Sequence, residues 1–405
     1  MKYIKAKIFI ILTFLVAGYF FSNDFGLIDI EKTAIVTACA IDKESDEYKV
    51  TLQIALPSGG GNGSQNSKAL LEGKGATVAE AIGKTGTVTG WYPSLSFCNL
   101  ILLGNSLKNE DLSKCLDYFS RSIKIQDSAI VAMTENNAYE LLEKASPLDN
   151  ISSFALQKVI LKKTGMDGDV LSCDLKEFEN NRFSRTTDGY MPLVYEIKEE
   201  NSDKAKSSES ESLGSNTSSS TGTGSNKDKT AFFSASKTML FKKGVYIGQL
   251  DEKETTAGVL IRRNVQDTDL PVKDVIIDGK NCNYMLRIIN SNFSTKIKLD
   301  QDKIVVKIIG KVYVKVADET SVDNKTSYQP LIILPDSVKE KAEKTLFEDI
   351  FSLTNKCKDL NFDFFDIDLK LYRLYPSKYE QLSKNMWDKI HFDIDVSIFG
   401  QKEYK

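Results

Sequence analysis

The chain has 405 residues, of which 41% are hydrophobic, 10% aromatic and 27% charged. A chain of this length usually makes two or three domains, and this composition supports ordinary buried cores. Its 53 basic and 56 acidic side chains leave a net charge of −3, with both signs mixed along the sequence. This balance excludes the basic stripe that nucleic-acid-binding proteins carry.

The N-terminal segment, residues 1–24, has the form of an export signal or a membrane anchor. Lys2, Lys5 and Lys7 precede fourteen uncharged, mostly apolar residues, 8–21. Basic residues before an apolar stretch are typical of a secretory signal whose basic end stays on the cytoplasmic side. We therefore expect the chain after residue 24 to be exported, which excludes a role in cytoplasmic metabolism.

Three states of this segment remain open. As a helix, the fourteen residues span ~21 Å, less than the ~30 Å hydrocarbon core, although local thinning and lysine snorkelling bridge such a gap. Val16-Ala17-Gly18 matches the first three positions of a lipobox, but Tyr19 stands where the lipid-bearing cysteine belongs. A lipid anchor at this position is therefore excluded. We favour an uncleaved anchor over a cleaved signal, and both over a buried helix, because the run has no polar face.

Residues 25–168 are predicted to form a mixed α/β domain. Residues 30–57 indicate two strands joined by a turn at 43–47, and 95–103 is a buried strand by its length and apolarity. The glycine-rich stretch 58–64 predicts a mobile loop. Helices are expected at 77–82, 111–122 and 138–144.

Residues 169–264 are predicted to form a small β-rich middle domain. Strand-like residues 193–197 and 231–233 flank a segment, 198–230, that is rich in Ser and Thr and has almost no apolar side chains. Such a composition buries too little surface to offset its ordering entropy, so we expect disorder there. We expect this segment to be a loop inserted between paired strands. A hairpin is predicted over 237–250, with its turn at 242–244.

Residues 265–405 are predicted to form a separate α+β domain. A long amphipathic helix over 336–358 is indicated by Val338, Ala342, Leu346 and Ile350, which recur every four residues. Strands are expected at 284–289, 295–299, 304–316 and 392–398. The fold class expected for the whole chain is therefore α+β, multi-domain, with largely antiparallel or mixed sheets.

The sequence contains no residue that we predict to be catalytic, cofactor-binding or metal-binding. Gly83-Lys84-Thr85 lacks the earlier glycine of a phosphate-binding loop, because position 78 is Val, so a helix end or turn is the better interpretation. The single histidine, His391, is expected to be structural or to face solvent. Trp91 and Trp387 are expected to be core anchors rather than ligand platforms.

Two further groups of side chains were weighed as possible sites. Asp363, Asp366, Asp368, Asp393 and Asp395 alternate with apolar residues, as on a strand with one wet face, so we favour a solvated face over a calcium site. The six cysteines show no metal-like spacing. We expect mostly free, buried thiols, although export permits disulfides. They lie at positions 39, 98, 115, 173, 282 and 357.

Several short patterns along the chain match those of one known family. In the first half they are Asp29-Ile30-Glu31-Lys32, Ala34, Ile41-Asp42-Lys43, Leu52-Gln53-Ile54-Ala55-Leu56-Pro57 and Gly75-Ala76-Thr77-Val78-Ala79-Glu80-Ala81. In the second half they are Phe241 to Leu250, Glu254-Thr255, Asp363, Arg373, Tyr375-Pro376, Trp387, Val396 and Gly400. In this order they resemble the C-subunit family of bacterial spore-germination receptors, often called Ger(x)C. The resemblance covers nearly the whole chain from residue 28.

The chain departs from the family pattern at three places. Tyr19 replaces the lipobox cysteine, and Asp366 and Asp368 stand where the pattern has glycines. Asn99 falls near a position where many members have His. These departures put in doubt the lipid anchor, the shape of the turn at 366–368, and any shared role for an imidazole.

The resemblance implies a non-enzymatic, membrane-associated subunit of a nutrient-germinant receptor. It would lie on the outer face of the spore inner membrane, need no cofactor, and work with integral-membrane A-type and B-type subunits. Two alternatives stay open: an exported small-molecule-binding or envelope scaffold protein, and an envelope hydrolase or transferase using Asp and Glu. The last lacks any recognisable acid/base pair.

Overall fold

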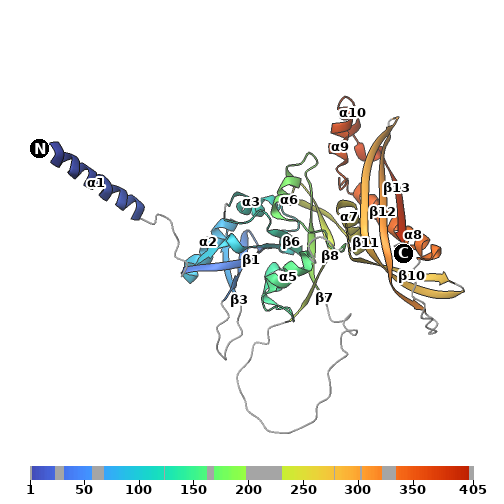
Figure 1. Ribbon diagram of the computed structural model, residues 1–405, viewed down its shortest axis with the longest axis horizontal. Coiled ribbons are helices and arrows are strands. Elements are labelled where there is room, and N and C mark those ends of the chain that lie inside the picture. The colour runs from blue at the N-terminus through green and yellow to red at the C-terminus, as the bar shows by residue number, and fades with distance from the viewer. Residues whose placement is uncertain are drawn as a thin grey trace, which may run out of the picture.

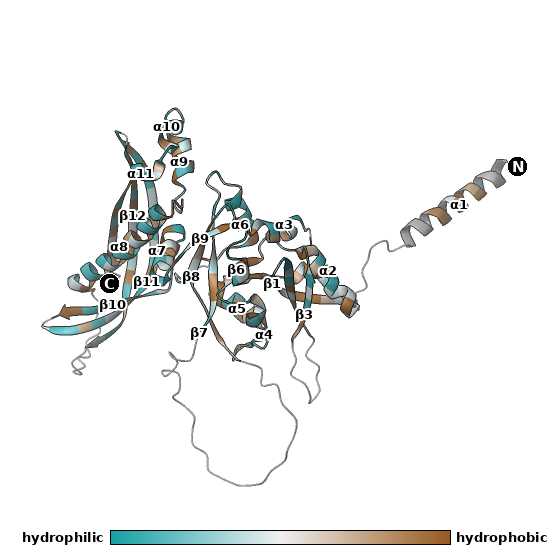
Figure 2. Ribbon diagram, turned by 180° about the vertical axis from the view of Figure 1, so that it is seen from behind, coloured by the Kyte–Doolittle hydropathy of each residue, from teal (hydrophilic) through white to brown (hydrophobic). Residues whose placement is uncertain are grey.

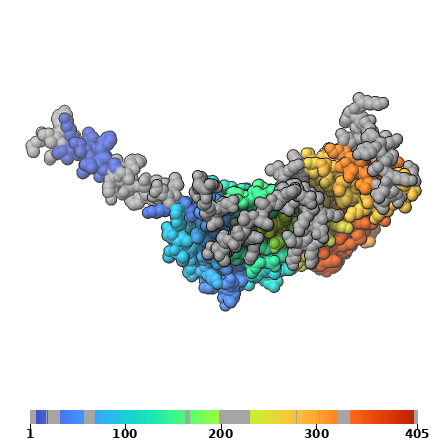
Figure 3. Space-filling model, turned by 90° about the horizontal axis from the view of Figure 1, so that it is seen from below, coloured from blue at the N-terminus to red at the C-terminus, as the bar shows by residue number. Residues whose placement is uncertain are grey.

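The computed structural model describes residues 2–22, 32–56, 68–122, 124–161, 168–197, 230–277, 279–301, 303–321 and 334–400. A helix, α1 (Lys2–Ser22), precedes two halves that are each built on their own β-sheet (Figure 1). Figure 3 shows the halves side by side, blue to green against yellow to red. The expected loop at 58–64 and the Ser/Thr-rich segment 198–229 lie outside the described residues.

Helix α1 presents apolar side chains all around its axis. Consecutive residues from Ile8 to Leu12 are 58–70% exposed, and Phe14 reaches 77%. Figure 2 colours much of the described stretch of this helix brown, as hydrophobic. Within the part of the chain that the structure describes, no helix combines the length and the apolarity needed to cross a membrane.

The first sheet is mixed, with a parallel centre and antiparallel flanks. Its strands follow the order β3-β2-β1-β5-β6-β7-β8-β9, and β4 pairs with β1 beside this path. Strands β1, β5, β6 and β7 run parallel, whereas β2, β3, β8 and β9 join as antiparallel neighbours. Their bounds are β1 (Thr33–Glu44), β2 (Glu47–Ala55), β3 (Lys68–Gly75), β4 (Tyr92–Ser94), β5 (Leu100–Leu103), β6 (Ile130–Thr134), β7 (Asp188–Ile197), β8 (Phe232–Lys242) and β9 (Val245–Leu250).

Helices cover both faces of this sheet, because its central strands are apolar on both sides. On β1, Cys39 and Ile41 join one core, and Ala38 and Ala40 join another. The first core includes side chains of α2 (Val78–Thr89), α3 (Ser113–Arg121) and α6 (Leu175–Arg182). The second includes those of α4 (Ala138–Glu143) and α5 (Ser152–Leu161). Short 3-10 turns, η2 (Leu95–Phe97) and η3 (Asn105–Leu107), flank β5.

Helix α2 shows how local sequence sets an element. The Thr77 side chain accepts from the Glu80 amide, which satisfies a free N–H group of the first turn, and the Glu80 carboxylate accepts from the amide of Ala76, just before the cap, at 2.9 Å. The helix ends at Gly90, whose φ of 72° suits a residue without a side chain. Residues 83–85 lie in the interior of this helix, and not at a helix end or turn as expected.

The second sheet has the order β10-β11-β12-β13. Helix α7 (Glu252–Arg262) leads into it, and α8 (Asp336–Asp359) packs on it with Val338, Ala342, Leu346 and Ile350 buried. The helix predicted from these four residues is therefore confirmed. Strands β12 and β13 are parallel, so the chain crosses over between them. The remaining bounds are β10 (Thr268–Ile277), β11 (Lys280–Asp300), β12 (Lys303–Ser321), α9 (Ile367–Leu374), α10 (Tyr379–Ser383), α11 (Met386–Lys389) and β13 (Ile390–Gly400).

The structure confirms the α+β class and several predicted connections. Strands β1 and β2 form the expected hairpin, and β8 and β9 form another whose turn contains Lys243 and Gly244, both at positive φ. Strands β7 and β8 pair antiparallel across the segment 198–229, so this segment does connect paired strands.

Four expectations need correction. The strands of residues 169–264 extend the first sheet through the pairing of β6 with β7, so they do not make a small domain of their own. The predicted strand 95–103 is divided between η2 and β5. Residues 284–299 form one long strand, β11, rather than two. Strands β3 and β10 were missed because glycines interrupt the first and Pro271 the second.

Candidate functional site: a buried polar joint between the two halves

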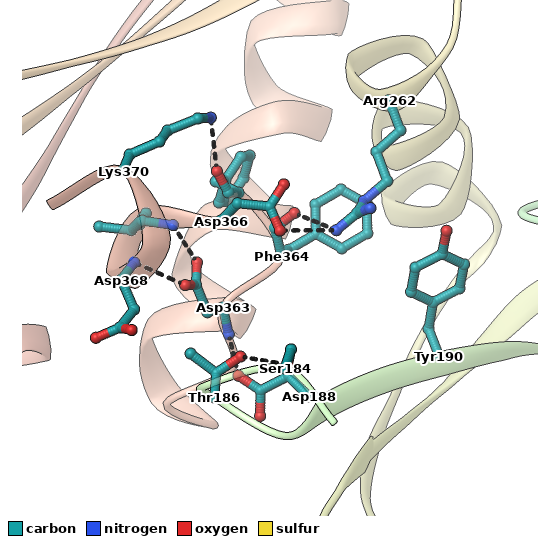
Figure 4. A network of polar contacts seen from close by, with 12 residues as sticks. Ser184, Thr186, Asp188, Tyr190, Arg262, Asp363, Phe364, Asp366, Asp368 and Lys370 are labelled. Carbon is teal, nitrogen blue, oxygen red and sulfur yellow. Dashed lines mark hydrogen bonds and ion pairs between the residues drawn. The ribbon is translucent and has the colours of Figure 1, made fainter. Parts of the chain in front are cut away.

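The segment 361–370 follows α8 and includes the start of α9. It inserts between the two halves, where it contacts β7 and α7 (Figure 4). It also contacts β8. We call this segment and its partners Asp188, Lys242 and Arg262 the joint. The Asp363 amide donates to Asp188 Oδ2 at 2.8 Å, and Lys242 Nζ donates to the Asn361 carbonyl at 2.6 Å. The joint thus hydrogen-bonds residues that are far apart in the sequence.

Asp363 lies at the centre of the joint and caps α9. Its Oδ1 accepts from the Ile367 amide at 2.7 Å and its Oδ2 from the Asp368 amide at 2.9 Å. These amides belong to the first turn of the helix and have no partner within it. Asp363 is only 6% exposed, and burial raises the pKa of its carboxyl to about 6, while the two amide bonds act in the opposite direction.

Asp188 is the second buried carboxylate of the joint. It begins β7 and is 7% exposed, and burial raises the pKa of its carboxyl. Its Oδ1 lies 3.7 Å from Lys242 Nζ, so the Lys242 ammonium serves both this carboxylate and the Asn361 carbonyl. One strand pair of the first half therefore supplies two of the charged groups that hold the inserted segment.

Arg262, at the end of α7, contacts the same segment from the other side. Its Nη2 donates to the Phe364 carbonyl at 2.8 Å, and its guanidinium lies 4.7 Å from the Phe364 ring centroid and 5.1 Å from that of Tyr190. A Cβ on Gly258 would lie 3.0 Å from Phe364 Cζ. The glycine therefore lets the ring approach α7 closely.

The two aspartates that replace family glycines have different roles. Asp366 adopts φ 55° and ψ 39°, a left-handed conformation that glycine enters freely and Asp tolerates better than most residues. Asp368 lies in the first turn of α9 and is 8% exposed. It accepts from Arg185 Nε at 3.2 Å and from the Tyr379 hydroxyl at 2.6 Å. This carboxylate adds a further link between the halves.

The expected solvated aspartate face is correct for only part of the set. Asp393 and Asp395 are exposed on β13 and lie 3.5 and 3.8 Å from Lys307 Nζ. Asp363 and Asp368 are buried instead, because the segment around them is a helix start and not a strand. Among the described residues, no three His, Cys, Asp or Glu side chains are grouped as a metal site would require.

Other residues of the matched patterns support the joint. Glu254 is 4% exposed and forms a capping box with Asp251 at the start of α7. It also accepts from the Ser352 hydroxyl at 2.8 Å, and Lys356 Nζ lies 3.6 Å away, so α7 and α8 are tied together. A Cβ on Gly248 would lie 2.6 Å from Leu360 Cδ1, so a larger residue here would displace the Leu360 side chain.

In the first half, a matched pattern fixes a helix in the same way. Asp42 is 4% exposed and accepts from the Ala138 amide at 2.9 Å and the Tyr139 amide at 3.1 Å, which caps α4. A Cβ on Gly104 would lie 1.8 Å from Asp42 Oδ1. Lys43 Nζ meets Glu110 Oε1 at 2.7 Å. These pattern residues therefore position elements of the fold.

The remaining candidates do not assemble with the joint. All six cysteines are free and buried, as expected, and burial raises the pKa of Cys39 and Cys173. His391 is exposed. Trp387 is half-buried and packs against the core, but Trp91 is 49% exposed, so the expectation that it anchors the core is wrong.

Sequence reasoning also missed two hollows at the amino ends of β5 and β6. Their volumes are ≈ 670 and ≈ 470 Å³, and both are lined by Gln126, Ser128 and Asp174. Asn99 lines the smaller one, together with Cys173. The raised pKa of Cys173 keeps its thiol protonated, so it is a poor nucleophile there.

Two family models match this chain, one after the other along the sequence. The first, described as the spore germination protein N-terminal domain, covers residues 27–195. The second, described as the spore germination B3/GerAC-like C-terminal domain, covers residues 236–399. The chain therefore belongs to this spore germination family, Ger(x)C, as the sequence patterns predicted.

Two known proteins are similar to most of the chain. It is 20% identical over 383 residues to YfkR of Bacillus subtilis (strain 168), which is named as a spore germination protein, and the match covers 91% of this chain and 89% of that one. The crystal structure of the GerBC protein matches with a TM-score of 0.50 and 16% identity, covering 92% of this chain and 100% of that chain. At this identity the second likeness concerns the fold.

Proposed function

We propose that this protein is a membrane-tethered, non-enzymatic C-type subunit of a nutrient-germinant receptor. It works with integral-membrane A-type and B-type subunits on the outer face of the spore inner membrane. The joint, which fixes the two family domains relative to each other, is the observation on which we base this function. A subunit whose halves keep one arrangement presents a single composite surface to its partners.

The chemistry of the joint supports a role in binding over a role in catalysis. Asp363 accepts two backbone amides, Asp188 accepts a third, and Asp368 is bonded to Arg185 and Tyr379. A catalytic carboxylate needs a free oxygen that faces the reacting atoms. Asp188 and Asp363 instead hold backbone amides, Asp368 holds two side chains, and Asp188 Oδ1 lies 3.7 Å from Lys242 Nζ.

The apolar, unpartnered α1 supports the tether. Exposing residues from Ile8 to Val16 to water is unfavourable, at roughly 25 cal/mol per Å² of apolar surface, and a lipid environment removes this penalty. The lysines at the start of α1 come before its apolar residues, which matches the orientation in which the rest of the chain is exported.

Capture of the tagged full-length chain from spore membranes, with its partners identified by mass spectrometry, tests this function. We expect A-type and B-type subunits to co-purify with the wild-type chain and with Arg287→Ala, which removes a partly exposed surface arginine. Arg262→Ala, which opens the joint, is expected to reduce their yield. Capture of neither subunit with the wild-type chain would contradict the proposal.

A further inference from the structure

An exposed apolar surface surrounds the point where the chain enters the first sheet. It consists of Ile35, Val88, Trp91 and Phe97, which are 46, 83, 49 and 59% exposed, and we call it the entry surface. Three of its residues come from a stretch, 85–107, that contains no charged side chain. In a chain with 27% charged residues, an uncharged stretch of this length is unusual.

Strand pairing brings these residues to one end of the first half. In the parallel pair β1–β4, Thr33 is opposite Tyr92 and Ile35 is opposite Ser94. Trp91 therefore lies level with Lys32, the first described residue after α1. The end of α2, which carries Val88, lies close by, because a Cβ on Gly86 would be 3.1 Å from the Trp91 carbonyl oxygen. Figure 1 shows α2 and the start of β1 at the end of the body nearest α1.

The length of the chain between α1 and β1 limits the distance between α1 and the entry surface. Ten residue steps separate Ser22 from Lys32, and an extended chain covers at most ~3.6 Å per residue, which gives roughly 36 Å. A body of about 200 residues is itself on the order of 40 Å across. If α1 is held in a bilayer, the entry surface is the part of the first half that is kept beside it.

The composition of the entry surface suits the lipid–water interface. Trp is enriched at that level because its ring is apolar and its N–H remains in the polar layer, and Phe and Val contribute burial without desolvating a charge. Lys124 flanks the surface, with its ammonium 4.8 Å from the Tyr92 ring centroid, and Lys32 is exposed. Cations at this border favour an anionic headgroup layer.

We propose that the entry surface lies on the bilayer beside α1 and inserts Trp91 and Phe97 into its interface. This inference rests on the proposed membrane tether and adds a second contact between the chain and the membrane. It would orient the first half, with α2 and β4 towards the lipid and the joint away from the point of attachment.

The two tryptophans of the chain allow a direct test. Trp387→Phe leaves Trp91 as the only indole, and Trp91→Phe leaves only Trp387, which packs against the core of the second half. The full-length chain carrying either change is reconstituted into phosphatidylcholine vesicles containing phosphatidylglycerol. The acyl chains are either unlabelled or brominated near the headgroup, and bromine quenches an indole in contact with it.

We expect brominated lipid to remove most of the Trp91 emission and to leave the Trp387 emission unchanged. Flotation of the same vesicles reports the α1 tether separately. A chain that floats but shows equal Trp91 emission in both lipids would overturn the lipid contact and leave the tether in place. If the entry surface is then covered only in the presence of partner subunits, it is a protein interface. A chain that does not float would overturn both.

Discussion

The joint and the entry surface place polar and apolar groups in opposite ways. The joint buries three carboxylates, those of Asp188, Asp363 and Asp368, whereas the entry surface exposes Trp91 and Phe97. The buried charges have their partners inside the chain, namely backbone amides, Arg185 and Lys242. Among the described residues, the contacts of the joint are therefore made within the chain, while the side chains of the entry surface are left exposed.

This difference predicts how each region responds to substitution. Removing one partner of a buried polar contact leaves the other without a partner, at a cost of about 1–3 kcal/mol. Truncating an exposed apolar side chain changes the free energy of unfolding by less than about 0.5 kcal/mol. Mutations in the joint should therefore destabilise the fold, and mutations in the entry surface should change only what the fold contacts.

The largest expected effect is a pH dependence centred on Asp363. Its pKa is about 6 in the folded chain and ~3.9 in an unfolded one, so the folded state binds the proton more tightly. The resulting stabilisation is complete below pH ~4 and is lost as the pH rises through about 6, by up to ~3 kcal/mol. Asp363→Ala removes this term.

Urea unfolding of the wild-type chain and of Asp363→Ala at several pH values measures it. The difference between their free energies of unfolding should shrink between pH ~4 and ~6.5. Asp393→Asn, at an exposed aspartate of β13, is the control for loss of an aspartate outside the joint. A difference for Asp363→Ala that does not change with pH would contradict the assignment.

A second substitution opens the joint from the side of α7. Arg262→Ala removes the hydrogen bond to the Phe364 carbonyl and the contacts with two aromatic rings, so we expect a loss of about 2–3 kcal/mol in unfolding free energy. Arg287→Ala removes exposed pairs with Asp267 and Asp269 and should cost less than ~1 kcal/mol. Equal losses for the two variants would show that the joint adds no particular stability.

The smallest expected effect belongs to the entry surface. Phe97→Ser should leave the unfolding free energy within about 0.5 kcal/mol of the wild type, because the ring is 59% exposed. In the chain whose only tryptophan is Trp91, the same change should reduce quenching by brominated lipid. A large loss of stability in urea would instead assign Phe97 to the core.

Local patterns predicted much of the fold, whereas contacts distant in sequence did not follow from them. Val338 to Ile350 repeat every four residues, and this period alone defines α8. The joint depends on Asp188 and Asp363, which lie 175 residues apart, and neither has a local pattern that reveals its partner. Alternation of Asp with Phe and Ile suggested a strand with a wet face, but the segment is the start of α9 and lies against the first half.

Some family patterns could be explained only from the structure. The glycine expected at position 366 corresponds to a left-handed residue, and Gly248 to a close contact with Leu360. Trp91 was assigned to the core because a large aromatic residue usually lies there. The absence of charge around it in 85–107 was the available signal for the exposed apolar surface that the structure shows.

The proposal that signalling depends on the joint is tested most directly by nutrient-triggered germination. Spores carrying Arg262→Ala are compared with spores carrying Arg287→Ala, with equal amounts of the chain in the membrane. We predict slow or absent germination for Arg262→Ala and a wild-type rate for Arg287→Ala. Wild-type germination by spores whose Arg262→Ala chain has lost the expected stability would contradict a role for the joint in signalling.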